Sequence, residues 1–135
     1  MTIRAATGAD VEAVLALWAR SRSAAASTPD DAAAVTRAVE RGALLVAERD
    51  GAVVGTLIAA WDGWRGNMYR LAVAPEHRRR GIARALVADG EARLRARGAR
   101  RITALVGRED DVAVAVWSAT GYADDTGIAR FVKNL

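Results

Sequence analysis

An arginine- and glycine-rich stretch near the middle of the chain carries residues suited to binding a phosphate. It reads Arg78-Arg79-Arg80-Gly81-Ile82-Ala83-Arg84-Ala85-Leu86, between the apolar run Leu71-Ala72-Val73 and an amphipathic stretch that closes on Gly98. We interpret this pattern as strand, loop and helix. The first N–H groups of a helix lack intrahelical acceptors, and the helix dipole adds positive charge there. Together with three arginines and a glycine that permits close approach, these groups predict a phosphate-binding loop.

Two stretches resemble the motifs of one protein family, the GNAT superfamily of N-acetyltransferases. Arg78-x-x-Gly81-x-Ala83, after Leu71-Ala72-Val73-Ala74-Pro75, is similar to the family's acetyl-CoA-binding motif Gln/Arg-x-x-Gly-x-Gly/Ala. Asp110-x-x-Ala113-x-x-Val116-Trp117-x-x-x-Gly121-Tyr122 is similar to its second motif, Asn-x-x-Ala-x-x-(Leu/Phe)-Tyr-x-x-x-Gly-Phe. The resemblance runs from about residue 2 to residue 135 and is most specific at residues 71–86.

The resemblance implies that acetyl-CoA is the cosubstrate, and the residue types lead us to expect no metal. The loop N–H groups would hold the diphosphate, and the thioester arm would pair with the strand before the loop. A backbone N–H near Val73 would stabilise the developing oxyanion. The residues implied for acetyl-CoA binding are Leu71, Ala72, Val73, Arg78, Arg79, Arg80, Gly81, Ile82, Ala83 and Arg84.

Proton transfer is where the chain departs from the family pattern. Trp117 occupies the position of the family's acid tyrosine and cannot donate a proton to the leaving thiolate. The thiolate either leaves without an enzyme acid or is assisted by water or Tyr69. For the base, Asp62 and Tyr69 are the candidates, and Glu48 is a weaker one. The alternative role of Asp62 is to form the turn, and that of Tyr69 is to pack against a neighbouring strand. If Asp62 is the base, Asp62→Asn should lower turnover without changing acetyl-CoA affinity.

Composition predicts one globular domain over residues 1–135. Hydrophobic residues make up 52% and charged residues 27% of the chain, and cysteine is absent, which excludes disulfides and a thiol nucleophile. A single histidine, His77, argues against a histidine metal site or a Ser-His-Asp triad. Without a long apolar run or a signal-peptide pattern at Met1-Thr2-Ile3-Arg4, we expect a cytoplasmic protein with no membrane partner.

The net charge of +4 is concentrated in the centre of the chain. Residues 65–101 hold eleven arginines against three acidic residues, whereas the remainder is net negative. This distribution fits an anionic ligand held at one place better than nucleic acid along a broad basic face, so we expect no nucleic-acid partner. A P-loop nucleotidase is excluded because no Gly-Lys-Ser/Thr follows the loop.

Hydrophobic periodicity and turn signals predict an α/β (α+β) protein, and the resemblance implies that its fold is the GNAT fold. We expect a single mixed, mostly antiparallel sheet of six to seven strands flanked by about four helices. The order is strand, helix, helix, three strands, helix, strand, helix, strand. The predicted strands are 2–5, 43–48, 52 to 60 or 61, 68–73, 101–106 and 128–135, and residues 21–28 are predicted to be a loop.

Four helices are predicted from capping and periodicity. The first follows Thr7-Gly8-Ala9-Asp10; the second has Thr28 as its cap and Pro29 at its first position; the third ends at Gly98. The stretch 112–116 alternates large and small residues, which locally favours a strand. The acidic residues before it, Gly121 after it and the resemblance favour a helix, which we predict.

The leading functional prediction is acetyl transfer from acetyl-CoA to a primary amine, with a small molecule as acceptor. Residues 102–109 lack the Leu-Glu-Val-Arg stretch of enzymes that acetylate protein N-termini, which argues mildly against a protein N-terminal or lysine acetyltransferase. A non-catalytic acyl-CoA-binding module is the other alternative, because of Trp117, and a nucleic-acid-binding protein is the third. Homodimers are common in the family, so a homodimer is a possible assembly.

Overall fold

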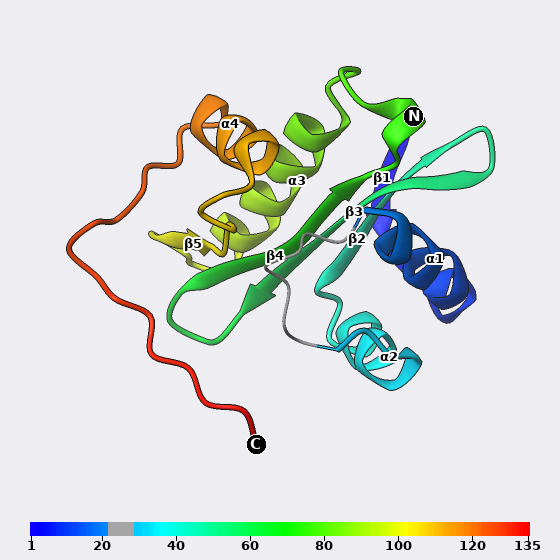
Figure 1. Ribbon diagram of the computed structural model, residues 1–135. Helices are drawn as coiled ribbons and strands as arrows, with labels where there is room; N and C mark the ends of the chain where they lie inside the picture. The colour runs from blue at the N-terminus through cyan, green and yellow to red at the C-terminus, as the bar shows by residue number, and fades with distance from the viewer. Residues whose placement is uncertain (22–28) are drawn as a thin grey trace.

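The computed structural model describes residues 1–21 and 29–135. Its centre is a five-stranded sheet whose spatial order, β1-β2-β3-β4-β5, is the order of the chain (Figure 1). The first four strands pair antiparallel, whereas β5 runs parallel to β4. The strands are β1 (Thr2–Ala5), β2 (Leu44–Arg49), β3 (Ala52–Trp61), β4 (Gly66–Val73) and β5 (Ile102–Ala104).

Helices cover both faces of the sheet. Figure 1 shows α1 (Val11–Ser21) and α2 (Ala32–Glu40) on one face, and α3 (Ile82–Ala96) and α4 (Asp111–Ala119) on the other. Two short 3-10 turns, η1 (Gly8–Asp10) and η2 (Pro75–His77), precede α1 and α3. Each face of the sheet has its own apolar core. The core between the sheet and α1 and α2 includes Val14, Trp18, Val35, Leu44 and Val46. The core between the sheet and α3 and α4 includes Leu57, Met68, Leu86, Val87, Leu94 and Trp117.

The helix α3 lies very close to the sheet because it has a glycine at the point of contact. A Cβ on Gly90 would lie 2.9 Å from both Leu57 Cδ2 and Met68 Cε. A glycine inside a helix costs about 1 kcal/mol relative to alanine, so close packing explains its presence here.

The ambiguous stretch 112–116 is helical, as predicted. Asp110 caps α4, since its side chain accepts a hydrogen bond from the Ala113 N–H at 3.0 Å. Gly121 follows the helix at φ +94°, a conformation that favours glycine. The caps therefore outweigh the local alternation of side-chain sizes.

The predicted final strand, Ile128 to Leu135, is wrong. In the described part of the chain the sheet has five strands rather than six to seven, and the residues after Gly127 run as irregular chain away from the body (Figure 1). The large apolar residues of this segment are exposed and do not alternate, so a strand made of it would have no apolar face. They are Ile128, Phe131, Val132 and Leu135.

The predicted start of the second helix is also wrong. Asp31, and not Thr28, is the cap, with its Oδ1 accepting from the Ala34 N–H at 2.7 Å. Asp30 is instead held by Arg70 of β4, 2.5 Å away. Thr28 and the predicted loop 21–28, apart from Ser21 at the end of α1, lie outside the described residues.

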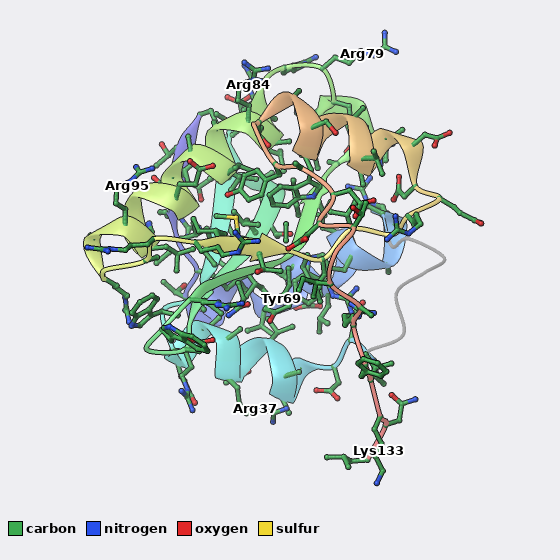
Figure 2. All side chains as sticks on the ribbon, turned by 90° about the vertical axis from the view of Figure 1, so that its left-hand side faces the viewer. Arg37, Tyr69, Arg79, Arg84, Arg95 and Lys133 are labelled. Atoms are coloured by element: carbon green, nitrogen blue, oxygen red, sulfur yellow. The ribbon has the colours of Figure 1, made fainter. Side chains whose placement is uncertain are left out.

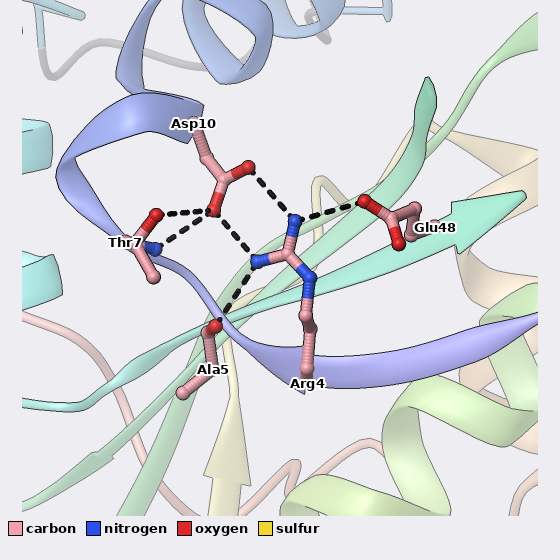
Figure 3. A network of polar contacts seen from close by, with 5 residues as sticks. All are labelled: Arg4, Ala5, Thr7, Asp10 and Glu48. Carbon is pink, nitrogen blue, oxygen red and sulfur yellow. Dashed lines mark hydrogen bonds and ion pairs between the residues drawn. The ribbon is translucent and has the colours of Figure 1, made fainter. Parts of the chain in front are cut away.

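A polar network joins the first strand to the start of α1 (Figure 3). The Arg4 guanidinium donates to both carboxylate oxygens of Asp10, at 2.8 and 3.0 Å, and to Glu48 at 3.1 Å. Asp10 also accepts from the Thr7 N–H at 2.7 Å, which is the acidic half of the predicted capping box. These bonds, above all the one from Arg4, lower the pKa of the buried Asp10 carboxyl from 3.8 to about 2.

We expect Asp10→Asn to lower the free energy of unfolding at pH 7 by about 2 kcal/mol, the value of a pKa shift of this size. Because the pKa is lower in the folded state, this stabilisation is complete above about pH 5 and is lost as the pH falls towards 2. Urea unfolding at pH 7 and pH 3 should therefore show a smaller difference between variant and wild type at pH 3. Asp124→Asn, which breaks an exposed ion pair with Arg108, is the control and should cost under about 1 kcal/mol. Equal losses at both pH values would contradict this account.

Candidate functional site

The strands β4 and β5 separate shortly after they begin to pair. Their ladder covers only Gly66–Met68 on β4 and Ile102–Ala104 on β5, and the Leu105 N–H donates to Met68 O at 3.3 Å beyond it. Further along β4, no strand in the described ranges pairs with the edge that β5 has left. The result is an open sheet edge along the second half of β4.

The backbone N–H groups of Leu71 and Val73 face this open edge. The Ala74 N–H donates to Val54 O of β3 at 2.8 Å, and successive N–H groups of a strand point to opposite sides. The N–H groups of Val73 and Leu71 therefore point away from β3. A chain laid along this edge could accept hydrogen bonds from both.

The loop between β4 and α3 ends in a helix N-terminus without a side-chain cap. Gly81 is the N-cap at φ +77°, and a Cβ built there would have no heavy atom within 4 Å. The helical hydrogen bonds start with the Ala85 N–H donating to Gly81 O at 3.0 Å. The N–H groups of Ile82, Ala83 and Arg84 precede that bond and have no intrahelical acceptor. Space and donors are both present for an anion.

Four arginines surround this helix start and are exposed to solvent: Arg78, Arg79, Arg80 and Arg84. Within the part of the chain that the structure describes, none of them forms an ion pair; Glu76, the nearest acidic residue in sequence, pairs with Arg20 at 3.2 Å. Figure 2 shows Arg79 and Arg84 together at one end of the molecule. Charges and N–H groups thus fit a multivalent anion such as a diphosphate.

A groove of about 250 Å³ continues from the loop between α3 and α4. It shares Arg84 with the loop, and its lining residues are Arg84, Val87, Ala88, Glu91, Ala119 and Thr120. The lining combines apolar and charged side chains, which suits a ligand that extends beyond its phosphate groups.

Asp62 lies in the turn between β3 and β4, at the opposite end of β4 from the loop. Its Oδ1 accepts from the N–H groups of Trp64 and Arg65 at 2.8 and 2.7 Å, and its Oδ2 accepts from Asn67 Nδ2 at 3.3 Å. The backbone bonds, led by that of Arg65, lower the pKa of this exposed carboxyl. These contacts give Asp62 a role in the turn.

Tyr69 lies in the middle of β4, partly exposed, between the arginine-rich end and the far end of the molecule (Figure 2). It pairs with Ile58 of β3, on the face covered by α1 and α2. Among the predicted site residues, those of the loop and of the open edge therefore lie close together, whereas Asp62 lies at the opposite end of β4.

Trp117 is a core residue, 6% exposed, and its ring meets that of Tyr122 edge-on at 4.8 Å between centroids. The Tyr122 hydroxyl donates to Glu91 Oε1 at 3.1 Å, and burial raises the pKa of this phenol. Sequence reasoning did not find this contact between α3 and the end of α4, since the two residues are thirty-one positions apart.

No group of three or more acidic or histidine residues is arranged to hold a metal ion among the residues that the structure describes. In the same residues, none of the helices is both long and apolar enough to span a membrane.

Comparison with known proteins finds a family match that includes the loop, the open edge of β4 and Trp117. Residues 11–122 match the model of the acetyltransferase (GNAT) family. An acetyltransferase of Photorhabdus laumondii is 45% identical over 80 residues, which cover 59% of this chain and 56% of that protein, so the match spans little more than half of the relative.

Solved structures share the fold. The aminoglycoside 6′-N-acetyltransferase of Acinetobacter haemolyticus aligns with a TM-score of 0.77 at 19% identity, covering 100% of this chain and 99% of that one. The PaiA N-acetyltransferase of Thermoplasma acidophilum, solved with coenzyme A, aligns with a TM-score of 0.80 at 16% identity, covering 90% and 89%. Ribosomal-protein-alanine N-acetyltransferases are also among the similar structures.

Proposed function

Because the chain belongs to the acetyltransferase (GNAT) family, we propose that it transfers the acetyl group of acetyl-CoA to the primary amine of a small molecule. The observation that carries this proposal is the uncapped start of α3, with Gly81 in the left-handed conformation and exposed arginines around it, next to the open edge of β4. Family members bind their cosubstrate with the same motif.

Each part of the site then has a task in direct transfer. The N–H groups of Gly81 to Arg84 and the arginines hold the diphosphate, and the edge of β4 orients the thioester arm. The acceptor nitrogen attacks the thioester carbon; the C–N bond forms, the C–S bond breaks, and CoA leaves as the thiolate. The N–H groups of Leu71 and Val73 stabilise the oxyanion that develops on the carbonyl oxygen. A thiol of modest pKa can leave without an enzyme acid, which is consistent with the buried Trp117.

A base must take a proton from the acceptor ammonium before its nitrogen can attack, and Asp62 and Tyr69 are the two candidates. An effective base has a pKa near the working pH, whereas the turn contacts lower the pKa of Asp62. We therefore expect Asp62→Asn to keep turnover within about twofold of wild type, since asparagine can still accept the turn hydrogen bonds. Tyr69→Phe, assayed beside it, tests the second candidate. A loss of about tenfold or more in Asp62→Asn, with unchanged acetyl-CoA affinity, would restore Asp62 as the base.

A small-molecule acceptor is supported by the aminoglycoside acetyltransferase among the structures of the same fold and by the stretch 102–109, which lacks the features of the enzymes that act on protein N-termini. The test is release of CoA thiol with an aminoglycoside, a polyamine and an N-terminal ribosomal-type peptide as acceptors. The enzyme adds no thiol background because it has no cysteine. Release with a small amine supports the proposal. Release with the peptide alone would make it a protein acetyltransferase, and binding of CoA without release on any amine would make it a binding module.

A further inference from the structure

The strand β4 contains a bulge that reverses which of its backbone groups face the open edge. Before the bulge, Gly66 and Met68 bond to the β5 side, through Arg101 O at 3.2 Å and the Leu105 N–H at 3.3 Å. After it, the register with β3 has shifted between Thr56 and Ile58, so Arg70 and Leu71 together oppose Leu57. Without the extra residue, the N–H groups of Leu71 and Val73 would be turned towards β3.

The bulge residue adopts a backbone conformation that few side chains tolerate. Arg70 has φ +55°, in the left-handed region that disfavours residues other than glycine. Such a conformation persists only where the surrounding structure holds it.

A buried hydroxyl holds the backbone of the bulge. Thr56, fully buried at 0% exposure, donates from Oγ1 to Arg70 O at 2.9 Å. The same oxygen accepts from Trp18 Nε1 of α1 at 2.8 Å. Without this donor, the Arg70 carbonyl would have to find another hydrogen-bond partner or move.

The side chain of the bulge residue, Arg70, is held by residues of α1 and of the segment that precedes α2. The Arg70 guanidinium lies over the Trp18 ring, 5.3 Å from its centroid, and Asp30 binds it at 2.5 Å. Both members of this ion pair are largely buried, with side chains 19% and 13% exposed. Trp18 and Asp30 lie on the helical layer that covers the other face of the sheet.

We propose that Thr56, Trp18 and the Asp30–Arg70 ion pair are positioning residues for acetyl transfer, because they hold the bulge that aims the Leu71 and Val73 N–H groups at the thioester. This inference rests on the proposed function. It connects the layer of α1 and α2 to the oxyanion donors on the far edge of β4 through one strained residue.

The test compares Thr56→Val, which removes the hydroxyl, with Thr56→Ser, which keeps it, and with Thr103→Val, on the exposed face of β5. Three quantities are measured: kcat with an amine that the wild type accepts, the Kd for CoA, and the ¹⁵N–¹H amide shifts of Leu71 and Val73. We expect Thr56→Val to lower kcat by about tenfold or more and to move both amide resonances, with the Kd for CoA within about twofold of wild type. Thr56→Ser and Thr103→Val should resemble the wild type.

Unchanged kcat and unchanged amide shifts in a folded Thr56→Val would overturn the inference. If Thr56→Val does not fold, the test uses Asp30→Asn, which removes one charge at nearly constant shape. Unchanged amide shifts of Leu71 and Val73 in Asp30→Asn would then overturn the inference. A wild type that releases CoA from no amine refutes the proposed function, whereas the amide shifts need no turnover and still report on the bulge.

Discussion

Gly81→Glu should abolish tight binding of CoA while the protein stays folded. The substitution places a carboxylate where a phosphate would lie against the uncapped N–H groups of α3, among four exposed arginines that form no ion pair with any residue of 1–21 or 29–135. We expect the Kd for CoA and for acetyl-CoA to rise by roughly 100-fold or more, about 2.7 kcal/mol, as titration calorimetry would measure. The backbone at φ +77° adds a folding cost of about 1 kcal/mol that is independent of the ligand.

Gly63→Glu is a matched control for this substitution. Gly63 also has positive φ, +91°, and also has no heavy atom within 4 Å of a built Cβ, but it lies in the turn at the other end of β4. Both variants should lose similar unfolding free energy, and only Gly81→Glu should lose CoA. Equal affinities for CoA in the two variants would show that the loop does not bind CoA. The arginines would then be expected to bind nucleic acid, which steeply salt-dependent binding to DNA would demonstrate.

Gly90→Leu should destabilise the fold more than Asp10→Asn does. Its Cβ alone would lie 2.9 Å from Leu57 Cδ2 and Met68 Cε, and both of those side chains are fully buried. Forcing extra atoms into a packed interior costs up to about 3 kcal/mol. For a chain of this size we expect the Tm to fall by roughly 10 °C, measured by circular dichroism.

The control for Gly90→Leu is Ala92→Leu, two residues further along α3 on its exposed face. Leucine and alanine differ little in helix propensity, so its Tm should stay within about 2 °C of wild type. A Gly90→Leu variant as stable as Ala92→Leu would show that Leu57 and Met68 can move aside, and the close approach of α3 would then need another explanation.

The loop and the helix that follows it could be predicted because their signals are local. Gly81, the arginines before it and the amphipathic helix after it lie within a short stretch, and the left-handed conformation of Gly81 follows from the residue itself. The hairpin at Asp50-Gly51 is predictable for the same reason, with both residues at positive φ.

What the sequence did not reveal depends on residues far apart in the chain. Thr56 meets Arg70 fourteen positions away and Trp18 thirty-eight positions away, so no local pattern marks Arg70 as a bulge. The start of α2 was misplaced for a similar reason: Asp30 is held by Arg70, which leaves Asp31 as the cap. The predicted fifth strand, 101–106, is in fact Ile102–Ala104, because the separation from β4 ends the ladder early.

The strands lie in the sheet in the same order as in the chain, which affects the order in which the sheet can assemble. After β1 and β2 have paired, each new strand leaving the ribosome can add to the one before it without waiting for a later segment. The antiparallel part of the sheet thus requires only short loop closures between β2, β3 and β4, which favours rapid assembly. The parallel strand β5 must wait for α3 to cross the sheet, and it then gains a ladder of only three residue pairs. We therefore expect β5 and α4 to join last during synthesis, so that the open edge along the second half of β4 takes its final form only after α4 has emerged.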